Sequence, residues 1–270
     1  MSATTLEQER GVARDTIVDI DAVSVRFDSK KKSVQALQDV DITVAKGEFI
    51  SIVGPSGCGK STLLRAISGI SPATEGRVLL RGDEVLAPRQ DVGFIFQRPA
   101  LMPWRDVRRN ILLQAEMRGM DRQRAEERCR ELISFTGLDG FEKSLPHELS
   151  GGMQQRAALC RALLHEPDVL LMDEPFGALD ALTREKMNVE MHRLWRERGM
   201  TVALVTHSVA EAVYLATRVV VMGPRPGRVI QEFEVDLPRE RDYEETMEHP
   251  EFHRVASRVR ELLGSGGSHE

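Results

Sequence analysis

The chain has 270 residues, of which 41% are hydrophobic and 29% charged, and its net charge at pH 7 is −5. This length can bury a sizeable core without disulfides, and the acidic balance argues against a nucleic-acid-binding domain. Three widely spaced cysteines, Cys58, Cys129 and Cys160, exclude a disulfide framework and a zinc cluster. No segment approaches the roughly 20 apolar residues of a membrane-spanning helix.

The first part of the chain is predicted to be a polar leader followed by short strands. Residues 1–16 have mixed charge and no periodicity, which indicates disorder. Apolar residues then alternate from Ile17 to Phe27, a basic turn follows, and a second run covers Val40 to Val44. These short hairpin-type segments predict an N-terminal antiparallel β-subdomain.

The rest of the chain alternates between buried strands and helices. Compact apolar runs at 49–53, 169–172 and 201–205 are typical of buried parallel strands, and short strands are also expected at 76–80 and 92–96. Helical patterns separate them, including an arginine-rich segment over 98–149. This alternation predicts an α/β fold with a mainly parallel sheet that helices cover on both faces.

A glycine-rich loop follows the run at 49–53. It matches the phosphate-binding pattern GxxxxGK[ST] with a strand before it and a helix after it, and consists of Gly54, Pro55, Ser56, Gly57, Cys58, Gly59, Lys60, Ser61 and Thr62. Glycines let successive N–H groups point at an anion, and the helix adds its positive end. We expect Lys60 to reach the β- and γ-phosphates and Ser61 to bind Mg²⁺. The alternative, a glycine-rich turn without a ligand, does not explain the register of Lys-Ser-Thr.

Two acidic residues end the run at 169–172. Asp173 and Glu174 lie at the carboxyl end of this strand, where open α/β sheets bind ligands. We expect Asp173 to hold Mg²⁺ and Glu174 to orient or deprotonate the attacking water. Alone, this run could be an ordinary acidic junction before Pro175; the preceding phosphate loop favours the metal site.

A second helix start contains Ser150, Gly151 and Gly152. A hydroxyl, bare N–H groups and the helix dipole can bind a phosphate there, although an ordinary N-cap is the alternative. The run Leu149–Arg156 resembles the signature sequence of ATP-binding-cassette (ABC) ATPases. In that family two cassettes pack head to tail, and each signature closes the phosphate loop of the other. The resemblance therefore implies a homodimer or a similar partner chain, with ATP and Mg²⁺ bound between them.

Further elements of this family occur in order. Gln97 matches the glutamine that contacts Mg²⁺ and the attacking water, and His207 matches the histidine that contacts the γ-phosphate. Residues 177–180, which end at Asp180, match the D-loop. Phe27 lies where the family places an aromatic ring on adenine, although strand alternation also allows a core position for it.

The resemblance implies a domain organisation. It covers about residues 17–232 and implies a P-loop ATPase domain over 17–235. A helical subdomain is expected at about 98–155 within it. A C-terminal helix and a flexible tail would occupy 236–270.

Two segments resemble the nitrate/sulfonate/taurine importer group more narrowly, namely Phe96–Trp104 together with Asn110, and Met222–Arg228. This resemblance implies an ATPase subunit at the cytoplasmic face of the cell membrane. It would contact integral-membrane permease subunits, serve a solute-binding protein indirectly, and bind no nucleic acid. Met102 and Trp104 are candidate docking residues, because Met and Trp are enriched at interfaces.

Other functional classes were weighed against this interpretation. A GTPase would need an NKxD motif, which the sequence does not contain. A small-molecule kinase would not explain the run Ser150–Gly152. The remaining alternative is a non-transport ABC ATPase that acts on DNA or on lipid-linked machinery.

Overall fold

The computed structural model describes residues 15–29, 32–177 and 179–265. Most of the predicted leader and the end of the tail therefore lie outside the described residues. The leader was predicted slightly too long, because Thr16 already belongs to a strand and the carbonyl of Asp15 accepts a hydrogen bond from the Lys46 N–H. Over the described ranges, no helix combines the length and the apolar character needed to cross a membrane.

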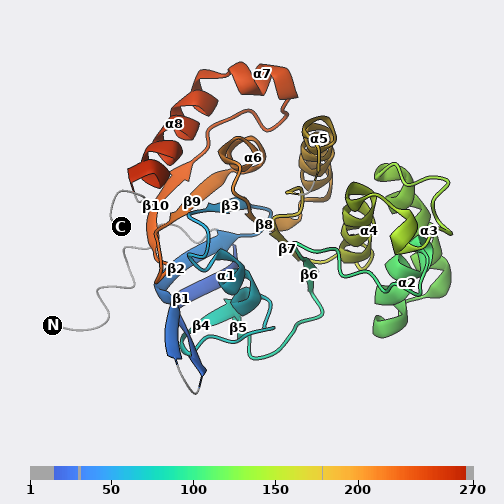
Figure 1. Cartoon of the computed structure of the whole chain (residues 1–270), viewed down its shortest axis with the longest axis horizontal. Coiled ribbons are helices and arrows are strands. Elements are labelled where there is room, and N and C mark those ends of the chain that lie inside the picture. The colour runs from blue at the N-terminus through green and yellow to red at the C-terminus, as the bar shows by residue number, and fades with distance from the viewer. Residues whose placement is uncertain (1–14, 30–31, 178, 266–270) are drawn as a thin grey trace.

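A six-stranded sheet forms the centre of the molecule (Figure 1). Its order is β10-β9-β3-β8-β7-β6, and the pairs between β9 and β6 are parallel, whereas β10 runs antiparallel to β9. The mainly parallel sheet is thus confirmed. The strands are β3 (Phe49–Val53), β6 (Val92–Ile95), β7 (Val169–Asp173), β8 (Thr201–Val205), β9 (Arg218–Met222) and β10 (Val229–Glu234).

Successive residues of each buried strand face opposite sides of this sheet. In β3, Phe49 and Val53 join one hydrophobic core, whereas Ile50 and Ile52 join a second core on the other face. Figure 1 shows α1 on the side of the antiparallel strands and α5 to α8 on the other side. These helices are α1 (Lys60–Ile67), α5 (Ala181–Arg198), α6 (Val209–Leu215), α7 (Tyr243–Glu248) and α8 (Pro250–Ser265).

The antiparallel sheet contains longer strands than the sequence predicted. Its order is β2-β1-β4-β5. Ala22 and Asp39 adopt left-handed backbone conformations, with φ of 49° and 46°, and the β1–β2 register shifts between Ile20 and Val25. Such bulges interrupt the apolar alternation while the strands stay paired, so our predicted short segments were wrong in length. The strands are β1 (Thr16–Ser29), β2 (Lys32–Ala45), β4 (Glu75–Leu80) and β5 (Asp83–Glu84).

Three helices form a lobe at the β6 edge of the central sheet (Figure 1). They are α2 (Val107–Arg118), α3 (Arg122–Phe135) and α4 (Gly151–Leu163), with a 3₁₀ turn at Pro146–Glu148 before α4. The side chains of Asp106, Asp121 and Ser150 cap their N-termini. α4 continues past residue 155 and packs into the hydrophobic core on one face of the central sheet. The domain boundaries stay a prediction.

The C-terminal helix packs on its own chain. Phe252, Val255 and Val259 of α8 are buried in the core that also contains α6 and β9. The predicted C-terminal helix is therefore present.

Candidate functional site

A cavity of about 570 Å³ lies where the parallel strands end at the phosphate loop. Most of the predicted nucleotide-binding residues line it, and they come from both sheets: Phe27, Ser56, Gly57, Gly59, Lys60, Ser61, Thr62, Gln97, Glu174 and His207. Val34, Ala36 and Arg225 also line the cavity and were missed from the sequence. Phe27 is 47% exposed, which removes the alternative that it is a core residue.

The backbone of the phosphate loop depends on glycine. Gly57 and Gly59 have φ of 75° and 108°, in the region that side chains other than glycine rarely adopt. A Cβ on Gly59 would lie 2.7 Å from Leu37 Cδ2 and 2.8 Å from the Ala36 carbonyl oxygen. The loop is therefore held closely against β2. Three residues that we predicted to bind nucleotide do not line the cavity, namely Gly54, Pro55 and Cys58. The Cys58 side chain is part of a hydrophobic core instead.

Lys60 is buried at the start of α1 and is only 5% exposed. Its ammonium donates to the carbonyl oxygens of Gly54 at 2.8 Å and Pro55 at 2.9 Å. These partners are dipoles without net charge. An incoming phosphate can therefore pair with the ammonium without displacing a carboxylate.

Ser61 and Asp173 form the pair of oxygen donors that we predicted for Mg²⁺. The Ser61 hydroxyl donates to Asp173 Oδ1 at 2.8 Å. Burial and the neighbouring Glu174 raise the pKa of Asp173, while the Ser61 hydroxyl lowers it. A buried carboxylate beside a hydroxyl fits a hard divalent cation, which takes oxygen ligands from one or two carboxylates and from phosphates.

Glu174 lies at the centre of the predicted catalytic residues. Its Oε2 accepts a hydrogen bond from Gln97 Nε2 at 2.8 Å and lies 2.6 Å from His207 Nε2. The Glu174 backbone has φ of 49°, and its N–H donates to the Val205 carbonyl at 2.8 Å. The structure thus places Gln97 on Glu174; its contact with Mg²⁺ stays a prediction.

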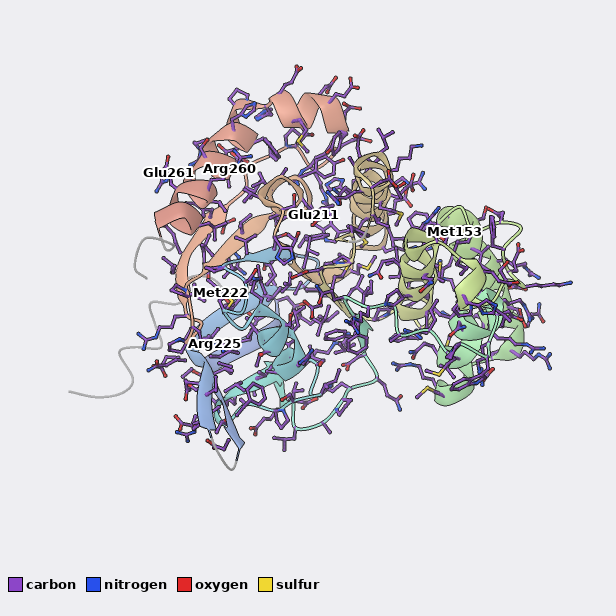
Figure 2. All side chains as sticks on the ribbon, viewed as in Figure 1. Met153, Glu211, Met222, Arg225, Arg260 and Glu261 are labelled. Carbon is purple, nitrogen blue, oxygen red and sulfur yellow. The ribbon has the colours of Figure 1, made fainter. Side chains whose placement is uncertain are left out.

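The signature residues lie away from this cavity in the same chain. Figure 2 shows Met153 on the α4 side of the molecule, well apart from Met222 and Arg225. Ser150 Oγ accepts a hydrogen bond from the Met153 N–H at 3.3 Å, so Ser150 is an N-cap. A Cβ on Gly151 would meet nothing within 4 Å, whereas one on Gly152 would lie 2.8 Å from Leu179 Cδ2. This geometry leaves the exposed tip of α4 open to a second molecule.

Asp180 also lies outside the cavity lining. Its carboxylate caps α5 by accepting a hydrogen bond from the Thr183 N–H at 3.0 Å. Hydrogen bonds from Thr183 lower the pKa of Asp180. The predicted role of Asp180 near nucleotide stays untested, and Ala178 of the same D-loop lies outside the described residues.

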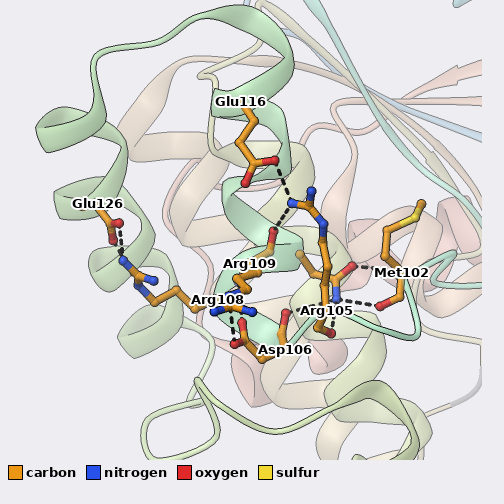
Figure 3. Close-up of polar contacts among 8 residues, drawn as sticks. Met102, Arg105, Asp106, Arg108, Arg109, Glu116 and Glu126 are labelled. Carbon is orange, nitrogen blue, oxygen red and sulfur yellow. Dashed lines mark hydrogen bonds and ion pairs between the residues drawn. The ribbon is translucent and has the colours of Figure 1, made fainter.

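The segment that follows Gln97 is held by two polar side chains, the buried Asn110 of α2 and the partly exposed Arg161 of α4. Asn110 is fully buried; its amide oxygen accepts from the Met102 N–H at 2.7 Å, and its Nδ2 donates to the Arg105 carbonyl at 2.7 Å. From α4, Arg161 donates to the carbonyl of Ala100 at 2.8 Å. Figure 3 shows Met102 and Arg105 at the turn that precedes α2. Trp104 is held there with 72% of its surface exposed.

Comparison with known proteins identifies the family of the chain. The ABC transporter family matches residues 37–177. A taurine import ATP-binding protein of Roseobacter denitrificans is 45% identical over 241 residues, which are 88% of this chain and 90% of that protein. An aliphatic sulfonates import ATP-binding protein of Bacillus cereus is 39% identical over 250 residues, or 93% and 97% of the two chains.

Solved structures show the same similarity. The ATP-binding cassette MJ0796, as a dimer in a post-hydrolysis state bound to ADP and Pi, superposes with a TM-score of 0.74. It is 31% identical in sequence, and the match covers 82% of this chain and 100% of that chain. The chain described here belongs to the ABC transporter family and is an ATPase of the ATP-binding-cassette type.

Proposed function

We propose that this chain powers the import of a small organosulfonate, such as taurine or an alkanesulfonate, through membrane permease subunits. The observation that carries the proposal is the cavity in which Lys60, Glu174 and His207 meet. The choice of this cargo class is supported by the similarity to taurine and sulfonate import proteins over most of the chain. These compounds are among the substrates that give the nitrate/sulfonate/taurine importer group its name, and the sequence resembles that group.

For hydrolysis, we assign separate tasks to the residues of the cavity. The backbone N–H groups of the phosphate loop and the Lys60 ammonium bind the β- and γ-phosphates. Glu174 orients the attacking water and accepts its proton, and His207 and Gln97 hold the Glu174 carboxylate in place at 2.6 and 2.8 Å. When bound, Mg²⁺ neutralises phosphate charge, and Ser61 and Asp173 are the residues that would hold it.

A second copy of the chain would complete the site. Ser150 and Gly151 are exposed at the tip of α4 and lie outside the cavity of their own chain. Because a helix N-terminus attracts anions, this tip can close on the γ-phosphate held by a partner. The dimeric arrangement of MJ0796 supports this assignment.

We assign permease docking to a groove of about 700 Å³ on the helical lobe. The charges along it are largely paired within the lobe: Arg105 bonds Glu116 at 2.8 Å, and Arg108 pairs with Glu126 (Figure 3). The exposed Trp104 also lines the groove. Since Arg105 and Arg108 already have partners, the indole ring is the strongest candidate for contact with an apolar permease segment.

Uptake in the host organism tests the proposal. With the gene for this chain deleted, we expect loss of radiolabelled taurine or alkanesulfonate uptake and loss of growth on these compounds as sole sulfur source. The wild-type gene should restore both, the Glu174→Gln variant neither, and growth on sulfate should be unchanged. The exposed Glu197 provides a matched control, since Glu197→Gln should restore uptake.

Two outcomes would overturn it. Unchanged sulfonate uptake with loss of nitrate uptake would assign the chain to another cargo of the same group. Normal uptake of all these solutes, together with a defect in DNA maintenance or lipid handling, would favour the non-transport alternative.

A further inference from the structure

The loop between β9 and β10 lies directly against the phosphate loop. The Gly227 N–H donates to the Ala36 carbonyl at 2.9 Å, and the Gln38 N–H donates back to the Gly227 carbonyl at 3.0 Å. A Cβ on Gly227 would lie 2.0 Å from the Cys58 carbonyl oxygen. The two loops therefore touch through their backbones, and residues 223–228 hold a fixed position beside the cavity.

Arg225 extends from this loop onto the apex of the phosphate loop. Its Nε and Nη2 donate to the Gly57 carbonyl oxygen at 3.1 and 2.8 Å. Arg225 also lines the cavity, on whose wall Phe27 and Val34 are found as well. Figure 2 shows Arg225 next to Met222, which is the last residue of β9. Neither bond to Gly57 uses Nη1, so this end of the guanidinium remains for another acceptor.

The charge of the cavity favours a phosphate as that acceptor. A nucleoside triphosphate carries several negative charges, and Lys60 and Arg225 are the lysine and arginine side chains that line the described cavity. A guanidinium presents planar N–H donors that match phosphate oxygens, and its charge persists at all physiological pH values. Arg225 can thus bind phosphate while its other N–H groups hold the loop.

We propose that Arg225 is a further nucleotide-binding residue, which fixes the Gly57 carbonyl of the phosphate loop and donates to the phosphate chain of the bound nucleotide. The proposal rests on the nucleotide site described above, and it is independent of the cargo and of the permease. It assigns a role to Arg225 within the run Met222–Arg228, which was identified from the sequence only by its resemblance to an importer group.

Nucleotide titration of the purified full-length chain tests this role. The Kd values of fluorescent MANT-ATP and MANT-ADP, with Mg²⁺, are measured at low and high salt. Since hydrogen bonds to charged groups are stronger than those between neutral groups, Arg225→Ala should raise both Kd values about tenfold or more. Its Kd should also depend less on salt, because one phosphate-facing charge is gone.

Two further Arg225 variants separate charge from loop support. Arg225→Gln keeps a donor for Gly57 without the charge, and we expect weak binding and a reduced salt dependence. Arg225→Lys keeps the charge with different geometry, and we expect partial rescue. Arg228 is the matched control, because it bonds Gln38 and does not line the cavity; Arg228→Ala should bind as the wild type does.

An Arg225→Ala variant with Kd values within twofold of the wild type would overturn the proposal. So would an Arg225→Gln variant with wild-type Kd and salt dependence, since the guanidinium charge would then not be used. Lys60→Ala tests the nucleotide site itself: unchanged binding by that variant would reject the site, whereas lost binding with normal Arg225 variants would reject only the role of Arg225.

Discussion

Glu174 combines an uncommon backbone conformation with a carboxylate oxygen that contacts two other side chains. Its φ of 49° costs free energy for a residue with a Cβ, of order 1–3 kcal/mol for sparsely populated regions. The hydrogen bond to Val205 and the contacts with Gln97 and His207 stabilise that conformation. The carboxylate is thereby positioned before nucleotide arrives, which reduces reorganisation during hydrolysis.

Replacement of this carboxylate should separate binding from chemistry. We expect Glu174→Gln to bind MgATP with wild-type affinity, because the amide keeps the size of the side chain. Loss of the base should reduce phosphate release by roughly 10²–10⁴-fold. Single-turnover phosphate release measures the rate, with Glu197→Gln as control. Turnover within a few-fold of the wild type would contradict the assigned role.

At the scale of elements, the sequence predicted those structures that depend on neighbouring residues. The Ser150 cap and the buried strands β3, β7 and β8 follow from local patterns. The full length of β1 and β2 did not, because bulges hide their alternation. Arg225 was missed for a different reason: its contact with Gly57 spans 168 positions, and only folding brings the two loops together.

The loop that carries His207 is held by a buried acid at the start of α6. The hydroxyl of Thr206 donates to Glu211 Oε2 and accepts from the Ser208 N–H at 3.0 Å. Burial raises the pKa of Glu211 to about 7; Thr206 and Arg184 oppose this rise, and Glu174 adds to it. Figure 2 places Glu211 beside the central strands. The protonation of Glu211 therefore affects the stability of this loop.

The sign of the pH effect follows from this pKa. In the unfolded chain the pKa of Glu211 is near its ordinary value of 4.5, so between pH 4.5 and about 7 the folded state holds a proton that the unfolded state has lost. This group therefore favours folding most at low pH, and its contribution falls as the pH rises through that window. We expect Glu211→Gln to remove this decline and to be more stable than the wild type at pH 8.

Urea unfolding at pH 5 and pH 8 measures the effect as the difference between the variant and the wild type. That difference is needed because His165 and His192, whose pKa values burial lowers to about 4, act in the opposite direction. Glu197→Gln serves as an exposed control. A pH-independent difference in the free energy of unfolding would reject the assigned pKa.

At the scale of the whole molecule, the exposed tip of α4 offers a test of assembly. A Cβ at Gly151 meets nothing within 4 Å, so Gly151→Asp should fold normally, and an acid there suits the helix dipole. It would, however, face the γ-phosphate of a partner, and like charges across an interface cost several kcal/mol. We expect ATP binding by the monomer to be retained and the ATP-bound dimer to be lost.

Analytical ultracentrifugation in the Glu174→Gln background, with and without ATP, measures that dimer. Gly264 also has open space around its Cβ position, and Gly264→Asp is the control. An ATP-dependent dimer that survives Gly151→Asp would show that the two chains meet through a different surface.

The hydrogen bonds that hold the segment around Trp104 have a mechanical consequence. Through Gln155 and Arg161, α4 is bonded to the carbonyls of Phe96, Pro99 and Ala100, while Ser150 lies at the other end of the same helix. In the proposed complex, a permease that moves the segment around Trp104 would therefore also move Ser150 at the start of α4. The pocket that Ser150 is proposed to close on the opposite copy would open or shut with that movement, and nucleotide-driven movement of Ser150 would act on the permease through the same helix.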